Sequence, residues 1–153
     1  MSSSLHPYSY YLEGDKYLFL TDSGALYAAY FLDLSTLAPD LYTFNFDRIH
    51  DGASGVVDNR VFDTVCTILE KFFQEHRNSM LIVCDTADGR EGARMRLFNS
   101  WYERIAPEGL LKVDRAGRAD IYSLFVSLLV WNDNPARERL VTILDEYCQT
   151  MLM

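Results

Sequence analysis

Apolar and polar residues alternate along LYTFNFDRI, the segment that begins at Leu41. Tyr42, Phe44 and Phe46 fall on one face of an extended chain, and the polar residues between them fall on the other. A period of two is typical of a β-strand that has one face on a core and the other in water. The segment therefore predicts a strand of an antiparallel sheet, because parallel strands are usually buried on both faces.

Three earlier segments have a similar strand-forming character. They are YSYYL (8–12), KYLFLT (16–21) and ALYAAYFLD (25–33), all rich in aromatic residues. The connections EGD and TDSG each contain a glycine, which hairpin turns favour. The first part of the chain therefore predicts four antiparallel strands.

The hydrophobic period changes after HDGASG, and Asp58 is in position to cap a helix. Apolar residues then recur at helical spacing at Val61, Phe62, Val65, Cys66, Ile68, Leu69, Phe72 and Phe73. A wide apolar stripe of this kind is typical of a helix that lies on a sheet. A buried strand, SMLIVCD (79–85), follows, and then a second segment of helical spacing, 88–105.

The last third of the chain predicts two strands and a helix. LLKVD (110–114) indicates a strand, RAGR (115–118) a turn, and IYSLFVSLLVW (121–131) a long central strand. Asn134 followed by Pro135 is a typical start for the final helix.

This order of elements predicts an α+β fold. We expect a mainly antiparallel sheet of about six or seven strands, with three helices packed largely on one face. A doubly wound parallel sheet is the less favoured alternative, because hairpins flank the strand–helix–strand units.

Length and charge limit the class of protein. A chain of 153 residues suffices for one core, so we expect a single domain over 1–153, with 1–4 disordered. The chain has no apolar run long enough to span a membrane and no secretory signal, so we expect a cytoplasmic location. The net charge of −8 argues against general affinity for nucleic acid or membranes.

The cysteines and the usual motifs indicate no cofactor. Cys66, Cys84 and Cys148 form no CxxC pair and have no histidine at ligand spacing, so we expect reduced core thiols. A P-loop, a GxGxxG and an HExxH are all absent from the sequence.

The charged residues are most concentrated in CDTADGREGARMRLFNSWYERI (84–105). Asp85 and Asp88 precede the predicted helix, where carboxylates cap the first turn and face the positive end of the dipole. Arg90 and Arg94 are four residues apart and share a helix face. Beside exposed backbone amides, such a pair is suited to bind a carboxylate or a phosphate.

Two other interpretations of this segment stay open. In the first, the acids and arginines only begin a helix, with surface ion pairs of little value. In the second, Asp85 and Asp88 hold Mg²⁺ while an arginine steadies a phosphoryl group. Their spacing of three differs from the D-x-D of haloacid-dehalogenase phosphatases.

Four blocks of the sequence resemble a known family. LYTFNFDRI, DNRVFDTVCTILEKFF, LIVCDTADGREGARMRLFNSWY and LLVWNDNP are similar to the successive blocks of small uncharacterised proteins from Bacteroidetes, catalogued as a domain of unknown function. The resemblance covers nearly the whole chain, and CDTADGREGARMRLFNSW is its most specific part. It implies a free-standing bacterial protein and brings no assigned activity.

The leading hypothesis is a non-enzymatic binding or protein-interaction module whose contact site is formed by Asp85, Asp88, Arg90 and Arg94. Its expected partner is an acidic protein or a small anionic ligand. The alternative is a metal-dependent phosphoester hydrolase that uses Asp85 and Asp88. A homodimer formed through a sheet edge or the aromatic hairpins is compatible with either.

Overall fold

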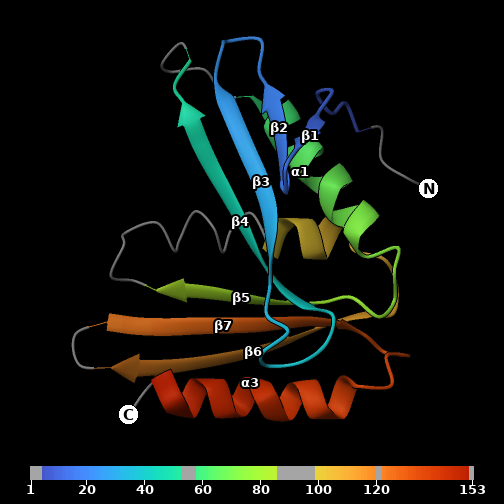
Figure 1. Ribbon diagram of the computed structural model, residues 1–153, viewed down its shortest axis with the longest axis vertical. Coiled ribbons are helices and arrows are strands. Elements are labelled where there is room, and N and C mark those ends of the chain that lie inside the picture. Colours follow the sequence, from blue (N-terminus) through green and yellow to red (C-terminus); the bar gives the residue numbers. More distant parts are fainter. Residues whose placement is uncertain (1–4, 53–57, 86–98, 120–121, 152–153) are drawn as a thin grey trace. The chain divides into compact units, whose positions relative to one another are not determined.

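The computed structural model describes residues 5–52, 58–85, 99–119 and 122–151 (Figure 1). Its strands are β1 (Tyr11–Glu13), β2 (Lys16–Leu20), β3 (Leu26–Asp33), β4 (Leu41–His50), β5 (Ser79–Asp85), β6 (Leu110–Ala119) and β7 (Tyr122–Trp131). The helices are α1 (Asn59–Phe72) and α3 (Arg137–Met151), and residues 99–104 are also helical.

The strands form one sheet in the order β1-β2-β3-β4-β5-β7-β6. β1 with β2, β2 with β3, β5 with β7 and β6 with β7 are antiparallel. β4 and β5 run parallel, with Leu41 opposite Ser79, and the chain joins them through α1. A parallel pair requires such a crossover. The predicted α+β class and the mainly antiparallel sheet are confirmed.

The chain divides into two compact units. The first consists of Met1–Leu32 and Phe44–Gln74, and the second of Asp33–Thr43 and Glu75–Met153. Each unit has its own cluster of buried apolar side chains. The single domain that we expect from the length stays a prediction.

Stacked aromatic rings form the core of the first unit. Phe19 of β2 is fully buried, and its ring centroid lies 5.3 Å from that of Tyr27 in β3. The ring centroid of Tyr27 is 5.1 Å from that of Phe46 in β4, and the two ring planes are nearly parallel. Such pairs stabilise a core beyond the area they bury. The aromatic residues of the early strands therefore have a structural role.

The helix α1 begins where the sequence predicts. Oδ1 of Asp58 accepts a hydrogen bond of 3.0 Å from the backbone N–H of Arg60, as an N-cap should. At the other end of the helix, the ring of Phe72 stacks on Phe31 of β3, with centroids 4.3 Å apart. The helix buries Thr64, Val65, Cys66, Ile68 and Leu69. Its apolar stripe therefore packs on the sheet of the first unit.

The first strand begins later than predicted, at Tyr11 instead of Tyr8. The backbone N–H of Tyr8 donates to Oγ1 of Thr64 in α1 at 2.9 Å. The guanidinium of Arg60 donates to the carbonyl groups of the two residues before Tyr8, at 2.9 and 3.2 Å. The predicted strand start is wrong because side chains of α1 bind the backbone groups that a sheet would need.

The predicted turn at residues 115–118 is also wrong. β6 continues through this segment to Ala119 and stays paired with β7, so that Arg115 lies opposite Val126 and Arg118 opposite Ser123. A glycine between arginines is therefore accommodated within a long strand. β7 lies between β5 and β6, so it is an interior strand, although it is second from one edge of the sheet and not at the predicted centre.

The helix α3 packs on one face of β6 and β7. Its buried leucines, Leu140 and Leu144, join a cluster that includes Val126, Leu128 and Val130 of β7. Because side chains alternate along a strand, the residues between these three belong to the opposite face. That opposite face carries the pocket described below.

The final helix starts slightly later than predicted. Asn134 lies before a turn, where its Oδ1 accepts from the backbone N–H of Ala136 at 2.8 Å, and α3 begins at Arg137. Gly14 and Gly24 adopt φ values of 65° and 89° in the two predicted hairpin turns. Such values favour glycine, so both turns are confirmed.

The described residues also bear on the cysteines and on membrane spans. Cys66 is a free thiol in the core, as expected, whereas the free thiol of Cys148 is only half-buried, and the side chain of Cys84 lies outside the described residues. Within the described part of the chain, no helix has the length and apolar character needed to cross a membrane.

Candidate functional site

The contact site inferred from the sequence lies almost entirely outside the described residues. Asp85 is the last residue of β5, and its backbone is opposite Leu124 of β7. Asp88, Arg90 and Arg94 are not among the described residues, and neither is the side chain of Asp85. The contact site formed by these four side chains therefore stays a prediction.

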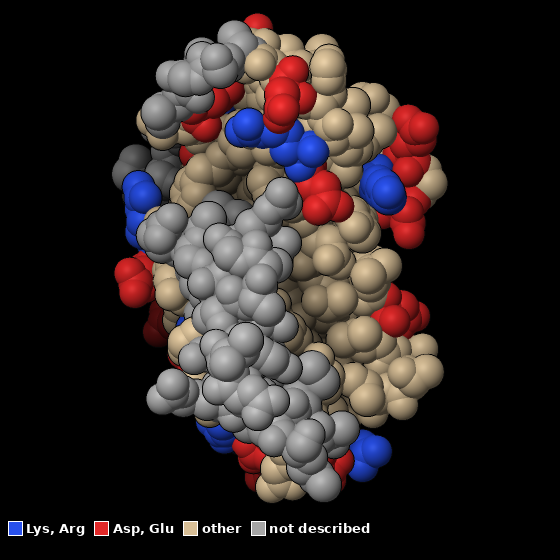
Figure 2. All heavy atoms as spheres, turned by 90° about the vertical axis from the view of Figure 1, so that its left-hand side faces the viewer, with Lys and Arg blue, Asp and Glu red and all other residues tan. Residues whose placement is uncertain are grey.

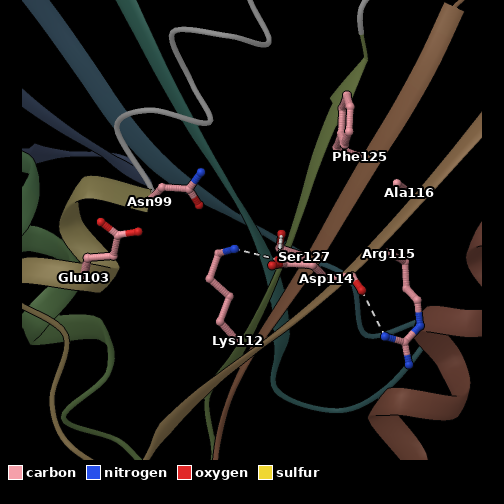
Figure 3. Close-up of a pocket in the computed structure, with 8 residues that line it drawn as sticks. All are labelled: Asn99, Glu103, Lys112, Asp114, Arg115, Ala116, Phe125 and Ser127. Carbon is pink, nitrogen blue, oxygen red and sulfur yellow. Dashed lines mark hydrogen bonds and ion pairs between the residues drawn. The ribbon is translucent and has the colours of Figure 1, made fainter.

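The described part of the second unit contains a pocket of about 410 Å³ on the face of β6 and β7 opposite α3 (Figure 3). Register explains its floor, because Asp114 lies opposite Ser127 and Ala116 opposite Phe125. The lining residues are Asn99, Glu103, Lys112, Asp114, Arg115, Ala116, Phe125 and Ser127. Two strands and one helical stretch therefore contribute to a single cavity.

Lys112, Asp114 and Ser127 form a connected group, which we call the Asp114 network. Nζ of Lys112 donates to Oδ1 of Asp114 at 2.6 Å, and Oγ of Ser127 donates to the same oxygen at 2.6 Å. The side chain of Lys112 is only 11% exposed and Ser127 is 2% exposed, whereas the side chain of Asp114 is 59% exposed. One buried hydroxyl and one largely enclosed ammonium thus hold a carboxylate that reaches the surface.

The network also keeps Asp114 ionised. Partial burial opposes the charge of this carboxylate, but the hydrogen bonds from Lys112 and Ser127 and the positive charges of Lys112 and Arg115 outweigh it. The pKa of Asp114 therefore lies below its usual value. A carboxylate with such a pKa is negatively charged throughout the neutral range.

Arg115 also lines the pocket, but its guanidinium group is paired with a carboxylate outside the pocket. Its Nε donates to Oδ1 of Asp145 in α3 at 2.7 Å, and one terminal nitrogen donates to the backbone carbonyl of Asp114 at 2.9 Å. Arg115 therefore ties the outermost strand, β6, to α3.

The helical residues 99–104 place two polar side chains at the pocket. Trp101 is fully buried, and the hydroxyl of Tyr102 donates to the carbonyl of Leu110 at the start of β6 at 2.7 Å. Asn99 and Glu103 are one helical turn apart, so they share a side of this anchored stretch. Figure 3 shows them on one side of the Asp114 network, with Phe125 on the other.

The burial of their hydroxyl group limits the chemistry that the described pocket residues can perform. Among the described lining residues, Ser127 carries the one hydroxyl, but it is buried and its proton is directed at Asp114. Among the residues that the structure describes, no group of three or more His, Cys, Asp or Glu side chains is placed to hold a metal ion. Within the described lining, the hydroxyl that lies beside a base is therefore enclosed by protein, and a nucleophile must be able to reach its substrate.

Charges of both signs are mixed on the visible surface. On the face in Figure 2, Lys and Arg side chains stand directly beside Asp and Glu side chains of the described residues. Nucleic-acid binding needs a continuous basic patch or stripe. The described surface in this view does not form one.

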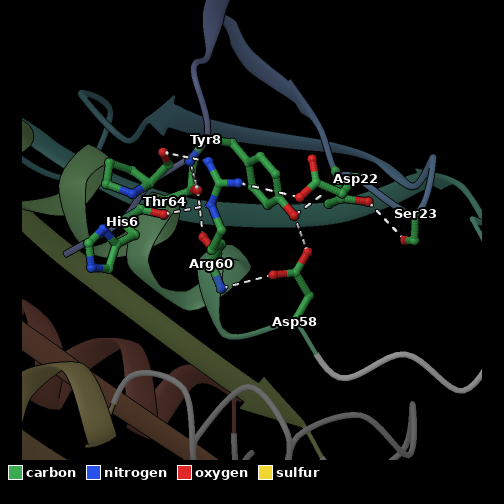
Figure 4. Close-up of polar contacts among 9 residues, drawn as sticks. His6, Tyr8, Asp22, Ser23, Asp58, Arg60 and Thr64 are labelled. Carbon is green, nitrogen blue, oxygen red and sulfur yellow. Dashed lines mark hydrogen bonds and ion pairs between the residues drawn. The ribbon is translucent and has the colours of Figure 1, made fainter.

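A second polar cluster lies in the first unit, around Tyr8 (Figure 4). The Tyr8 hydroxyl donates to Asp58 and accepts from the backbone N–H of Asp22 at 3.2 Å. The guanidinium of Arg60 lies 3.9 Å from the centroid of the Tyr8 ring and 3.4 Å from Oδ2 of Asp22. Burial raises the pKa of the Tyr8 hydroxyl, and the Asp58 carboxylate adds to this effect. These contacts join the N-terminal segment to α1, so we assign the cluster to folding.

Reasoning from the sequence missed the pocket. Lys112 and Asp114 occupy alternate positions of LLKVD, and Ser127 interrupts the apolar run of β7. Those polar positions were the available signal. They form a cluster only because Asp114 is placed opposite Ser127, and this register is a property of the folded sheet.

Fold and site together define an α+β domain with a polar pocket on one face of its sheet. The chain belongs to the family of unknown function DUF6169, whose model matches residues 57–148. The match contains every pocket residue, confirms the resemblance to a domain of unknown function and leaves LYTFNFDRI outside it. No curated protein and no solved structure matches the chain.

Proposed function

We propose that this chain is a non-enzymatic binding module and that the pocket on β6 and β7 is its ligand site. The observation that carries this proposal is the Asp114 network, in which the largely enclosed Lys112 and the buried Ser127 fix one oxygen of an ionised carboxylate that lines the pocket. Desolvation of an ammonium group such as that of Lys112 costs free energy that an ion pair offsets only in part. Stability alone is therefore a weak reason for this arrangement, whereas prepositioned polar groups are typical of ligand sites.

The test is a titration of the ¹⁵N-labelled full-length chain with a panel of amines, carboxylates, alcohols and sugars. We expect at least one of these classes to shift the backbone amide signals of Glu103, Asp114 and Phe125 in a saturable manner. If every class leaves these signals unchanged at millimolar concentration, the pocket is not a ligand site and the proposal fails.

The sequence supports a second contact, which is independent of the pocket. We propose that Arg90 and Arg94 bind an acidic protein or a small anion, while Asp85 and Asp88 cap the helix. Pull-down with a double variant, Arg90→Ala and Arg94→Ala, tests this contact. An unchanged partner list at normal stability would count against it.

The rival function is a metal-dependent phosphoester hydrolase that uses Asp85 and Asp88. A titration with Mg²⁺ or Mn²⁺ distinguishes it from the binding module, because a ligand that binds the folded state raises the melting temperature. The hydrolase predicts such a rise and the binding module predicts none.

The resemblance and the composition support a cytoplasmic protein of Bacteroidetes. Detection of the native protein in the soluble fraction of such a bacterium tests this origin and this location. A homodimer through an exposed sheet edge is a further proposal, and light scattering of the purified chain would reveal it.

A further inference from the structure

The charges of the pocket lining are unevenly compensated. Lys112 is paired with Asp114, and Arg115 is paired with Asp145, which lies outside the pocket. Glu103 makes no ion pair within the described part of the chain. The described part of the lining therefore has one unopposed negative charge, that of Glu103, and this charge would repel an entering anion.

Asp114 has an oxygen to offer a ligand. Both of its donors, Lys112 and Ser127, bind Oδ1. Among the described residues, no donor bonds to Oδ2 of Asp114. More than half of the Asp114 side chain is exposed, so a ligand can reach this oxygen. An ionised carboxylate accepts several hydrogen bonds, and it prefers charged donors such as ammonium and guanidinium groups.

An aromatic side chain completes the lining. Phe125 lies two residues before Ser127 on β7, so both belong to the same face of the strand, and Phe125 is 36% exposed. Ammonium and guanidinium groups are attracted to aromatic rings, whereas carboxylates are not. Asn99, on the helical side, adds an amide that can accept a further N–H.

Taken together, these groups point to a positively charged guest. We propose that the pocket binds an organic cation with a primary ammonium or guanidinium group, which contacts Oδ2 of Asp114, while the carboxylate of Glu103 and the ring of Phe125 attract it from the two sides of the Asp114 network. This inference rests on the proposed function, because it assigns a ligand class to the same pocket. The net charge of −8 would draw such a cation towards the protein. A cavity of about 410 Å³ is large enough for a small amine or for one Lys or Arg side chain.

The experiment compares three probes of similar size and different charge. n-Butylamine, n-butanol and butyrate are titrated separately into the ¹⁵N-labelled full-length chain. We expect saturable shifts at the amides of Glu103, Asp114 and Phe125 with the amine alone. Agmatine and the peptide acetyl-Ala-Arg-Ala-amide then distinguish a free small cation from an arginine side chain within a peptide.

A matched pair of variants separates the pocket from the general acidity of the chain. Glu103→Gln removes the unopposed charge of the lining, and we expect it to weaken amine binding roughly two- to fivefold, the value of one exposed ion pair. Glu108→Gln makes the same chemical change at an exposed residue outside the pocket and should leave the affinity unchanged.

The outcomes distinguish this inference from the proposed function. Butyrate or butanol bound at the pocket in preference to the amine would overturn the cation assignment and leave a binding module. Equal weakening in both variants would also overturn it, because the attraction would then be nonspecific. If no probe and no member of the wider panel reached the pocket, both proposals would fail together.

Discussion

Nζ of Lys112 lies 2.6 Å from Oδ1 of Asp114, the residue two positions further along the same strand, and the Lys112 side chain is only 11% exposed. Residues two apart on a strand share a face, so the pair is a consequence of the extended conformation of β6. Ser127 reaches the same oxygen from the neighbouring strand. The Asp114 carboxylate therefore both joins β6 to β7 and presents a negative charge to the pocket.

Removal of the Asp114 carboxylate should destabilise the chain by leaving the largely enclosed Lys112 ammonium without its counter-charge. We expect Asp114→Asn to lower the free energy of unfolding by about 1–3 kcal/mol, below the full cost of a completely buried pair because Asp114 is partly exposed. Lys112→Met, which removes the buried charge and keeps the length of the side chain, should cost less. Urea unfolding followed by circular dichroism measures both. An Asp114→Asn variant as stable as the wild type would contradict this prediction.

The contribution of Asp114 should depend on pH in a defined direction. Its pKa in the folded protein is lowered, so ionisation of Asp114 stabilises the fold above its unfolded-state pKa of about 3.9. This stabilisation is lost as the pH falls through the folded-state pKa. We expect the difference in unfolding free energy between wild type and Asp114→Asn to be constant from about pH 8 to 5 and to shrink below about pH 4. A difference that persists unchanged in acid would show that Asp114 acts through packing instead.

The hydroxyl of Tyr8 should stabilise the first unit. Tyr8→Phe removes the hydrogen bonds to Asp58 and from Asp22 but keeps the buried ring, and we expect a loss of about 1–3 kcal/mol because one partner is charged. The control is Tyr11→Phe, since Tyr11 is 55% exposed and should lose almost nothing. Thermal unfolding of the two variants makes the comparison. Equal melting temperatures would indicate that the Tyr8 hydroxyl is not part of the fold's stability.

Gly52 should tolerate no side chain. A Cβ at this position would lie 2.5 Å from the backbone nitrogen of Ala25 and 2.5 Å from the carbonyl oxygen of Ser23, and neither can move without disturbing the hairpin. We expect Gly52→Ala to cost about 2–3 kcal/mol. Gly14→Ala is the control, because its surroundings are open and only its positive φ opposes alanine, at about 1 kcal/mol. Chemical denaturation ranks the two variants, and a larger loss for Gly14→Ala would contradict the predicted clash.

Much of the architecture follows from local patterns. The period of two in β4, the apolar stripe of α1, the cap at Asp58 and the glycines of the two hairpin turns each depend on residues close together in sequence. Those patterns predict the order of the elements and the α+β class correctly, because the energies behind them are local. The candidate contact at Arg90 and Arg94 was inferred in the same way, and it stays a prediction.

Contacts between residues far apart in sequence could be seen only in the tertiary structure. Tyr8 lies outside the first strand because its backbone N–H bonds to the side chain of Thr64, and because Arg60 bonds to the carbonyl of the preceding residue. Both partners are more than fifty residues away in sequence. The arginines of RAGR belong to β6 because the backbone of this segment pairs with β7. The pocket exists because Asp114 is opposite Ser127 and beside a helical stretch that carries Glu103. A sequence lists which side chains are polar, but strand pairing and packing determine which of them meet.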